Sequence, residues 1–413
     1  MDLLYVTNPG SNDLRWGTPL GGGLTVVIPL GFAGHRIVAM PGQRYLYITG
    51  NKIVNGDIHA WLAVIDTCNN TVLAPEVDLG IGFAGQCAVP DSVGGNRAYV
   101  AISQAVGERV LQGADSRIEV LNVLNPVAPV RLPGPITPST QSSPYGFLHI
   151  VWSFRLNTLY ASHRGDNRIY YFTPLGGQAN LQSFSAGNEQ PMGLGISNDG
   201  LVLFIARRLA GDVLEFDLLA QPPAQIGMPI PLPNADTRSG MFIAVASQDR
   251  VLVTSTRQQD GFLNIIQHQR PQAPAPQIQS IDTTGTRLGQ PAVNPDSTVV
   301  YVPRGDQNDV AQIDLPNATL FPGFLASSRA ACSTATGLPP SNPTAPSGVS
   351  PTRSAPAPST SDASERPENI TVAVGGRKGD APQFFRKKTG AQTDASPLHP
   401  QWGYRASRRR VMS

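Results

Sequence analysis

Four arginines recur at nearly the same place along the chain, each just after an apolar, strand-like run and each followed closely by an aspartate. The arginines are Arg164, Arg208, Arg257 and Arg304, and the aspartates are Asp166, Asp212, Asp260 and Asp306. A guanidinium offers paired donors that suit a carboxylate or a phosphate, so a ring of arginines could bind a small anion. On a solvated hairpin the Arg and the Asp could equally pair with each other, which contributes little to stability. The spacing leaves both interpretations open.

Three further charged residues precede the strand-like runs that follow these turns. They are Glu189, Arg238 and Arg287. In a propeller, the loop that enters an inner strand lies on the same face as the turn between the second and third strands. We therefore predict that these residues belong to the same ligand-binding region as the four arginines.

Two of the histidines are candidates for proton transfer in the same region. His149 lies in a predicted inner strand, and His163 ends the next strand, directly before Arg164. With Glu189 they could move protons while an arginine binds a carboxylate. A purely structural role for either histidine is the competing hypothesis.

Several other chemistries have no support in the sequence. The six histidines and three cysteines show no metal-ligand spacing, and phosphate-loop and haem-ligand patterns are missing, so we predict neither metal nor cofactor. Aromatic residues make up 7% and follow strand periodicity, which disfavours specific nucleic-acid binding. No apolar run reaches the roughly 20 residues that span a bilayer. Cys68 and Cys87 could form a disulfide or remain buried thiols.

The elements that must position these residues form a repeat. An apolar run rich in aromatic and β-branched residues returns at intervals of about 40–60 residues, as in radially repeated blades of four strands. The runs begin at Leu4, Tyr45, Ala98, Leu159, Leu203, Leu252 and Val300. The 41 glycines and 38 prolines suit the many turns of such a protein. We predict an all-β, seven-bladed propeller of four-stranded antiparallel blades.

Three segments of the repeat resemble a known family. They are Tyr5-Val6-Thr7-Asn8, Val64-Ile65-Asp66-Thr67 with Asn70-Thr71-Val72, and Pro191-Met192-Gly193 through Asp199-Gly200. Over roughly residues 1–316 the chain is similar to the YVTN-type β-propeller repeats, which include surface-layer proteins and lactonase-like propellers. The resemblance implies the fold, whereas the activities within the family differ.

The repeat also predicts how the chain divides. Residues 1–320 should form the propeller, with a first blade that lacks its inner strand, and 321–413 a low-complexity tail with a basic end. The Ser, Thr, Pro and Ala-rich stretch 327–369 is predicted to be disordered because it has little to bury. Two segments could complete the first blade: one upstream of Met1, which we favour, or the late apolar run 370–374.

Two functions fit these observations. We favour a monomeric, noncatalytic binding or scaffold protein, secreted or at the cell surface, that presents its arginine-bearing face to a protein partner or a small anionic ligand. The alternative is a lactonase-like hydrolase of a sugar or acyl lactone, as some proteins of the resembled family are. In it, Arg164 would bind a carboxylate, and His149, His163 and Glu189 would be the catalytic residues.

Overall fold

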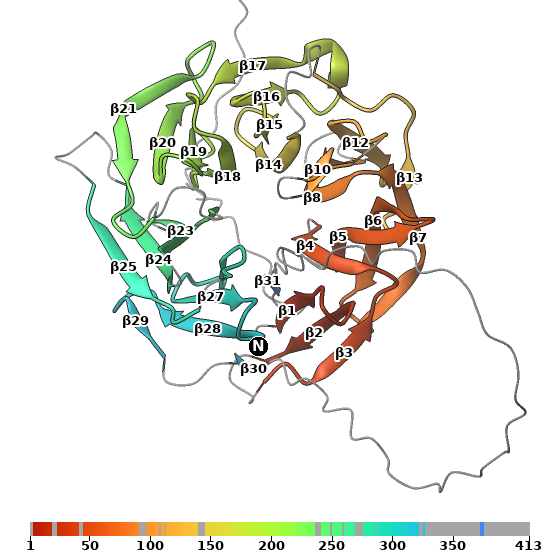
Figure 1. Ribbon diagram of the computed structural model, residues 1–413, viewed down its shortest axis with the longest axis horizontal. Helices are drawn as coiled ribbons and strands as arrows, with labels where there is room; N and C mark the ends of the chain where they lie inside the picture. Colours follow the sequence, from red (N-terminus) through yellow and green to blue (C-terminus); the bar gives the residue numbers. More distant parts are fainter. Residues whose placement is uncertain are drawn as a thin grey trace, which may run out of the picture. The chain divides into compact units, whose positions relative to one another are not determined.

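The protein is a ring of small antiparallel sheets, seen along its axis in Figure 1. The computed structural model describes residues 3–18, 23–40, 44–90, 96–106, 109–111, 113–138, 145–235, 241–247, 250–257, 260–268, 276–285, 287–321, 325–326 and 372–375. Seven sheets of four or more strands follow one another around the ring, and a single short 3-10 helix, η1 (Gly177–Asn180), is present in the described part. The predicted seven-bladed, all-β propeller is confirmed.

The blades are numbered along the chain, and their strands have the following bounds. Blade 1 contains β1 (Leu3–Asn8), β2 (Asp13–Gly17), β3 (Val26–Pro29) and β31 (Val372–Gly375). Blade 2 contains β4 (Ala33–Ala39), β5 (Tyr45–Val54), β6 (Asp57–Asp66) and β7 (Thr71–Ile81). Blade 3 contains β8 (Phe83–Ala88), β9 (Arg97–Ser103), β12 (Arg117–Asn122) and β13 (Val130–Arg131), with a side hairpin of β10 (Ala105–Val106) and β11 (Arg109–Val110).

The remaining four blades are more compact. Blade 4 contains β14 (Phe147–Ser153), β15 (Thr158–His163), β16 (Arg168–Phe172) and β17 (Gln182–Ser185). Blade 5 contains β18 (Pro191–Ile196), β19 (Val202–Arg207), β20 (Asp212–Asp217) and β21 (Ala224–Pro231). Blade 6 contains β22 (Phe242–Val245), β23 (Arg250–Arg257), β24 (Asp260–Gln267) and β25 (Ile278–Asp282). Blade 7 contains β26 (Ala292–Val293), β27 (Val299–Arg304) and β28 (Asp309–Asp314), with β29 (Thr319–Leu320) and β30 (Leu325–Ala326) sharing the outer position.

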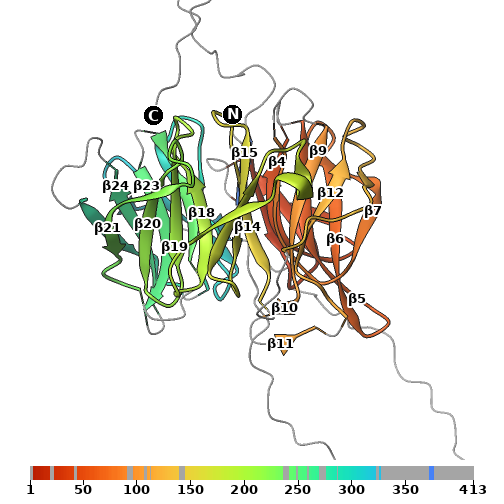
Figure 2. The ribbon, with the colours of Figure 1, turned by 90° about the horizontal axis from the view of Figure 1, so that it is seen from above.

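Strand register shows which loops share a face. In blade 4, Phe147 at the start of the inner strand pairs with His163, and His163 pairs with Arg168. The turn between the second and third strands therefore lies beside the entry to the inner strand, as we predicted. We call this side of the ring the entry face. Figure 2 shows β10, β11 and the end of the long β5–β6 hairpin on this same side.

The hydrophobic core lies between neighbouring blades, and the aromatic residue on the second strand of the repeat fills much of it. These residues occupy equivalent places on the second strands and are 0–1% exposed: Tyr47, Tyr99, Tyr160 and Phe204. Each packs in a cluster that joins its own blade to the next. A buried aromatic ring contributes roughly 2–3 kcal/mol of hydrophobic free energy. Tyr47 also satisfies its hydroxyl, which donates to the carbonyl of Pro126 at 3.0 Å.

The ring is closed by a strand from late in the sequence. In β31, Val372 pairs with Val6 and Gly375 with Leu3, so residues 372–375 supply the inner strand of blade 1. Our preference for a segment upstream of Met1 as this strand was wrong. The run from 370 to 374 contains β-branched residues that favour an extended strand, and enough chain precedes it to reach β1.

Three further predictions concern the C-terminal tail, the cysteines and membrane-spanning segments. The stretch 327–369, predicted to be disordered, and the basic end 377–413 both lie outside them. Cys68 is exposed, Cys87 is buried, and both are free thiols. Within the described part, no helix has the length and apolar character needed to cross a bilayer.

Candidate functional site

The inner strands of blades 2 to 5 share an irregularity. In each strand the pairing register shifts by one residue: between Gly34 and Arg36, Ala84 and Cys87, Phe147 and Ile150, and Pro191 and Leu194. Such a β-bulge re-aims side chains and is common beside active sites. The bulged segments carry polar residues that are unusual in a buried strand, namely His35, Arg36, Gln86 and His149.

Hydroxyl groups on two second strands bind the backbone of three of the bulges. Thr49 Oγ1 donates to the carbonyl of Gly85 at 2.7 Å, across the boundary between blades 2 and 3. Ser162 Oγ donates to the carbonyl of Met192 at 2.9 Å and accepts the backbone N–H of His149 at 3.2 Å. Gly85 has no room for a side chain, because a Cβ would lie 2.3 Å from a carbonyl oxygen of β14. The bulged backbone is thus fixed by contacts between neighbouring blades.

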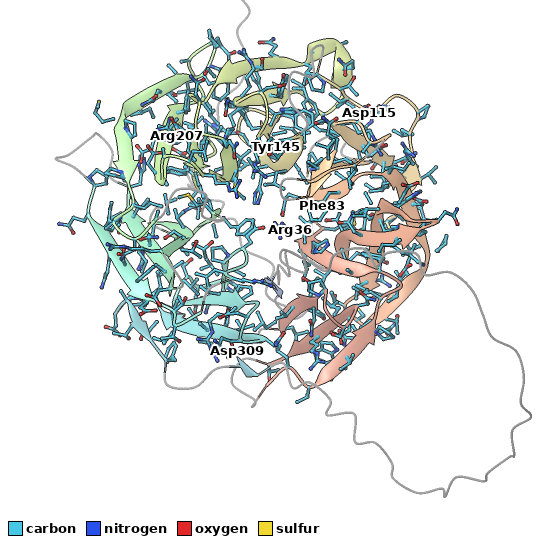
Figure 3. All side chains as sticks on the ribbon, in the orientation of Figure 1. Arg36, Phe83, Asp115, Tyr145, Arg207 and Asp309 are labelled. Carbon is cyan, nitrogen blue, oxygen red and sulfur yellow. The ribbon has the colours of Figure 1, made fainter. Side chains whose placement is uncertain are left out.

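Five side chains from the inner strands of blades 2, 3, 4 and 6 gather near the axis of the ring. We call them the axial cluster: His35, Arg36, Phe83, His149 and Phe242. The guanidinium carbon of Arg36 lies 4.6 Å from the ring centroid of Phe242, and the His149 ring lies 5.5 Å from that same ring. The His35 ring lies 5.1 Å from that of Phe83. Figure 3 shows Arg36 and Phe83 near the centre of the ring.

The axial cluster combines one cation with two neutral imidazoles. Burial, with the Arg36 charge as the second cause, lowers the pKa of both His35 and His149 to about 3. Burial also lowers the pKa of Arg36 to about 10, which still leaves its guanidinium charged at pH 7. Within the described residues, neither ring nitrogen of His149 has a hydrogen-bond partner.

This arrangement suits hydrolysis of a carbonyl compound. A guanidinium can stabilise the oxyanion that forms when water attacks a carbonyl, and a neutral imidazole can accept the proton that the water gives up. Buried polar atoms normally find partners, so the nitrogens of His149 are suited to a bound molecule. Gln86 adds a further such atom, since its Oε1 has no hydrogen-bond partner among the described residues.

A second cluster lies on the entry face, between blades 4 and 5. Arg164 Nε and Arg208 Nη1 donate to the same Gln190 Oε1, at 3.0 and 3.4 Å. The Arg164 guanidinium also lies 4.2 Å from the ring centroid of Tyr145. Tyr145 stands shortly before His149 on the segment that enters β14. The structure therefore brings two of the predicted arginines together, above the strand that carries His149.

Arg304 is placed differently from these two. Its Nε and Nη2 donate to the two carboxylate oxygens of Asp309, at 2.7 and 2.5 Å, and its Nη1 donates to the carbonyl of Thr283 at 2.7 Å. By register it corresponds to Arg207, which binds Asp212 in the same way, and not to Arg208. Arg304 thus joins β27 to β28 within its blade and binds the backbone that follows β25 of blade 6.

The other predicted binding residues are dispersed along the loops of the entry face. Arg257 is exposed, and its Nη1 donates to Asn234 Oδ1 at 3.4 Å. Arg287 is exposed too, while Glu189 is partly buried beside Gln190. Arg238 lies outside the described residues. Their predicted role in ligand binding stays a prediction.

His163 is packed between blades rather than in the axial cluster. Its Nε2 lies 2.9 Å from the hydroxyl oxygen of Ser116, within hydrogen-bond distance. Its Nδ1 accepts a hydrogen bond from the backbone N–H of Asp166 at 3.1 Å. Its ring meets that of Phe147 edge-on at 4.9 Å. Burial lowers its pKa to about 4, against the opposing charge of Asp166. These are the contacts of a structural histidine.

Sequence reasoning named His149 but missed Arg36, its neighbour at the axis. Arg36 lies outside the Arg–Asp turns, on an inner strand, so a search for repeated turns passes over it. The signal that could have found it is a charged residue inside an otherwise apolar strand of the repeat. No group of three or more His, Cys, Asp or Glu side chains in the described part is placed to hold a metal ion.

Several solved structures have a fold similar to that of this chain. No family model and no curated protein matches the chain. The periplasmic gluconolactonase of Pseudomonas aeruginosa matches at a TM-score of 0.63 and 15% identity, over 78% of this chain and 95% of that one. A Lactobacillus plantarum protein matches at 0.60 and 14%, over 79% and 96%. A putative 6-phosphogluconolactonase of Bacteroides fragilis matches at 0.56 and 11%, over 78% and 93%.

These likenesses correct our leading interpretation. At 11–15% identity they establish a shared propeller fold with lactonase-like neighbours, and the resemblance to YVTN repeats in particular stays a prediction. The noncatalytic binding or scaffold protein that we favoured was the wrong choice of the two, because the similar structures named for an activity include a gluconolactonase and a putative 6-phosphogluconolactonase. The hydrolase alternative has the better support.

Proposed function

We propose that the protein is a lactonase-type hydrolase whose reaction takes place at the axial cluster. The observation that carries the proposal is the buried Arg36 guanidinium beside His149, whose ring nitrogens have no partner in the described part of the chain. The lactonase-like neighbours support the same reaction class.

In the proposed reaction, water attacks the lactone carbonyl and His149 accepts a proton from that water. Negative charge then develops on the carbonyl oxygen, where the Arg36 guanidinium stabilises it. The Arg36 charge helps to keep the pKa of His149 low. An oxyanion on Arg36 offsets that charge, so protonation of His149 becomes easier as the attack proceeds. The imidazolium returns its proton to the ring oxygen as the C–O bond breaks, which yields a hydroxy acid that then loses its carboxyl proton to solvent.

The cluster on the entry face supports a preference among lactones. Arg164 and Arg208 both donate to Gln190 Oε1, so their two guanidinium groups lie close together at the approach to β14. A phosphate or carboxylate on the substrate, away from the lactone carbonyl, would be attracted there. We therefore propose that sugar lactones with a charged substituent are preferred over uncharged ones.

The experiment is a turnover assay on the full chain with glucono-1,5-lactone, its 6-phosphate and an acyl homoserine lactone. We expect acid release from at least one, and a loss of 10²–10⁴-fold in kcat for H149Q, the range typical of a lost general base. H59Q is the matched control, because His59 lies on the β5–β6 hairpin beside Asp78. An inactive wild type, or an H149Q variant as active as the wild type, would contradict the proposal.

The preference is tested separately with R164Q/R208Q. This double variant should raise KM for the phosphorylated lactone about tenfold while leaving the uncharged lactone unaffected. Equal effects on both lactones would remove the entry-face cluster from the proposal. An extracytoplasmic location stays a prediction, supported by the periplasmic neighbour, and cell fractionation tests it.

A further inference from the structure

The strand that closes the ring is attached to its blade in an unusual way. Other inner strands continue into their partners through short turns, as β14 does into β15 between Ser153 and Thr158. In contrast, β31 lies far from β1 in the sequence, and residues 327–371 separate it from β30. Only noncovalent contacts therefore hold β31 in blade 1.

The edge of β1 that receives β31 is a ready-made site for an extended peptide. Four residue pairs join the two strands in antiparallel register, from Leu3↔Gly375 to Val6↔Val372. Leu4 and Val6 of β1 are 0% and 1% exposed, and they pack against Tyr301 of blade 7. The core of blade 1 is thus formed with residues of β2 and of blade 7. An extended peptide that adds a strand to a sheet edge is a common mode of recognition.

The position of β31 also links this edge to the rest of the ring. The strand contacts β4 of blade 2 on one side and β26 of blade 7 on the other. It therefore bridges the last and first blades of the ring. Its sequence, Val372-Ala373-Val374-Gly375, contains two β-branched residues, which favour an extended strand.

We infer that β31 is an exchangeable ligand of the propeller: the inner edge of β1 binds an extended apolar peptide with the sequence of residues 370–375, supplied by the chain itself or from outside. The intervening chain keeps the segment at a high effective concentration, of the order of millimolar for a flexible linker. A free peptide must therefore compete with it in the intact protein. This inference does not depend on the proposed hydrolase activity.

The test uses the full chain with the recognition sequence of a specific protease inserted between Ser347 and Gly348. After cleavage, the C-terminal fragment carries β31 but is no longer covalently linked to the ring. A fluorescent peptide of residues 366–377 should then bind the cleaved protein, raise its anisotropy and displace the fragment. Uncleaved protein should bind the peptide at least tenfold more weakly, because the tethered segment competes. A peptide carrying V372P and V374P should not bind, since proline disrupts strand pairing.

Three results would overturn the inference. The fragment could remain on the ring through a day in a hundredfold excess of peptide, so that the strand does not exchange. The ring could lose its β-sheet circular dichroism when the fragment leaves, so that the strand is not a separable ligand. The proline peptide could bind as well as the natural one, so that strand pairing is not what holds it.

Discussion

Arg36 at the axis and Arg304 in blade 7 are equally buried, each 3% exposed, yet their surroundings differ. Arg304 binds both carboxylate oxygens of Asp309 and the carbonyl of Thr283. Arg36 donates from Nη1 to the carbonyl of His35 at 3.0 Å, and its guanidinium lies over the face of Phe242, beside His149. The same residue type, at the same depth, thus meets a local anion in one place and an aromatic ring with a neutral imidazole in the other.

Arg304 is thus paired with a carboxylate of its own hairpin, whereas the Arg36 guanidinium faces an aromatic ring at the axis. The carboxylate of Asp309 lies across the same hairpin, so the Arg304 charge is matched by its own blade. Burial lowers the pKa of Arg36 to about 10, which means that the fold disfavours its charged form. A buried charge held at such a cost is a mark of functional sites.

The largest effect that we expect concerns the arginine in the blade. Arg304→Met should lower the free energy of unfolding by about 3–5 kcal/mol, because Asp309 is left without its cation in a largely buried place. Urea unfolding measures the loss. The double variant R304M/D309L should recover most of it, since no unmatched charge remains. If R304M were as stable as the wild type, Arg304 would not be a residue that stabilises the fold.

The corresponding substitution at the axis, Arg36→Met, tests the proposed catalytic role of Arg36. Arg36→Met should reduce kcat/KM for lactone hydrolysis by about 10²–10³-fold, as for the loss of an oxyanion donor. It should lower the free energy of unfolding far less than R304M does, because the hydrogen bond to the His35 carbonyl is lost together with a charge that burial disfavours. Turnover and urea unfolding of one preparation measure both quantities. A strongly destabilised R36M would make Arg36 a structural residue like Arg304.

The sequence predicts the fold better than it predicts the site, and two sets of residues show why. Tyr47 and Tyr99 recur because each blade must bury one face against the next, so the repeat reveals them directly. The position of Arg36 depends on a bulge, and bulges here are fixed between blades, as Thr49 fixes Gly85. A contact between residues so far apart leaves no periodic mark in the sequence.

The same reasoning explains the uneven outcome for the predicted arginines. By strand register Arg304 corresponds to Arg207, and Arg208 lies one residue further along. A shift of one residue turns a side chain to the other face of a strand. His149 could be named from its place in an inner strand, but not its aromatic neighbour Phe242, which comes from a distant blade.

Acid stability tests the electrostatics of the axial cluster. The pKa of His149 is about 3 in the fold and about 6.5 in the unfolded chain, so the unfolded state binds more protons between these values. Stability is therefore complete above pH 6.5 and falls as the pH drops. At pH 5 the loss due to His149 should be ~2 kcal/mol. H149Q should remove that part of the difference between pH 7 and pH 5 in urea unfolding, and H59Q should not.

The smallest effect concerns the hydroxyl that positions His149. Ser162→Ala removes a donor to Met192 and an acceptor of the His149 N–H, and should lower the free energy of unfolding by about 1–2 kcal/mol. Ser255→Ala is the matched control, because this buried hydroxyl also makes two hydrogen bonds, to Asn234 and Asn264, in blade 6. We expect similar losses of stability but a fall in kcat for S162A alone. Equal kcat values for the two variants would mean that the bulge does not set the position of His149, and that the axis, like the blades, is organised for stability only.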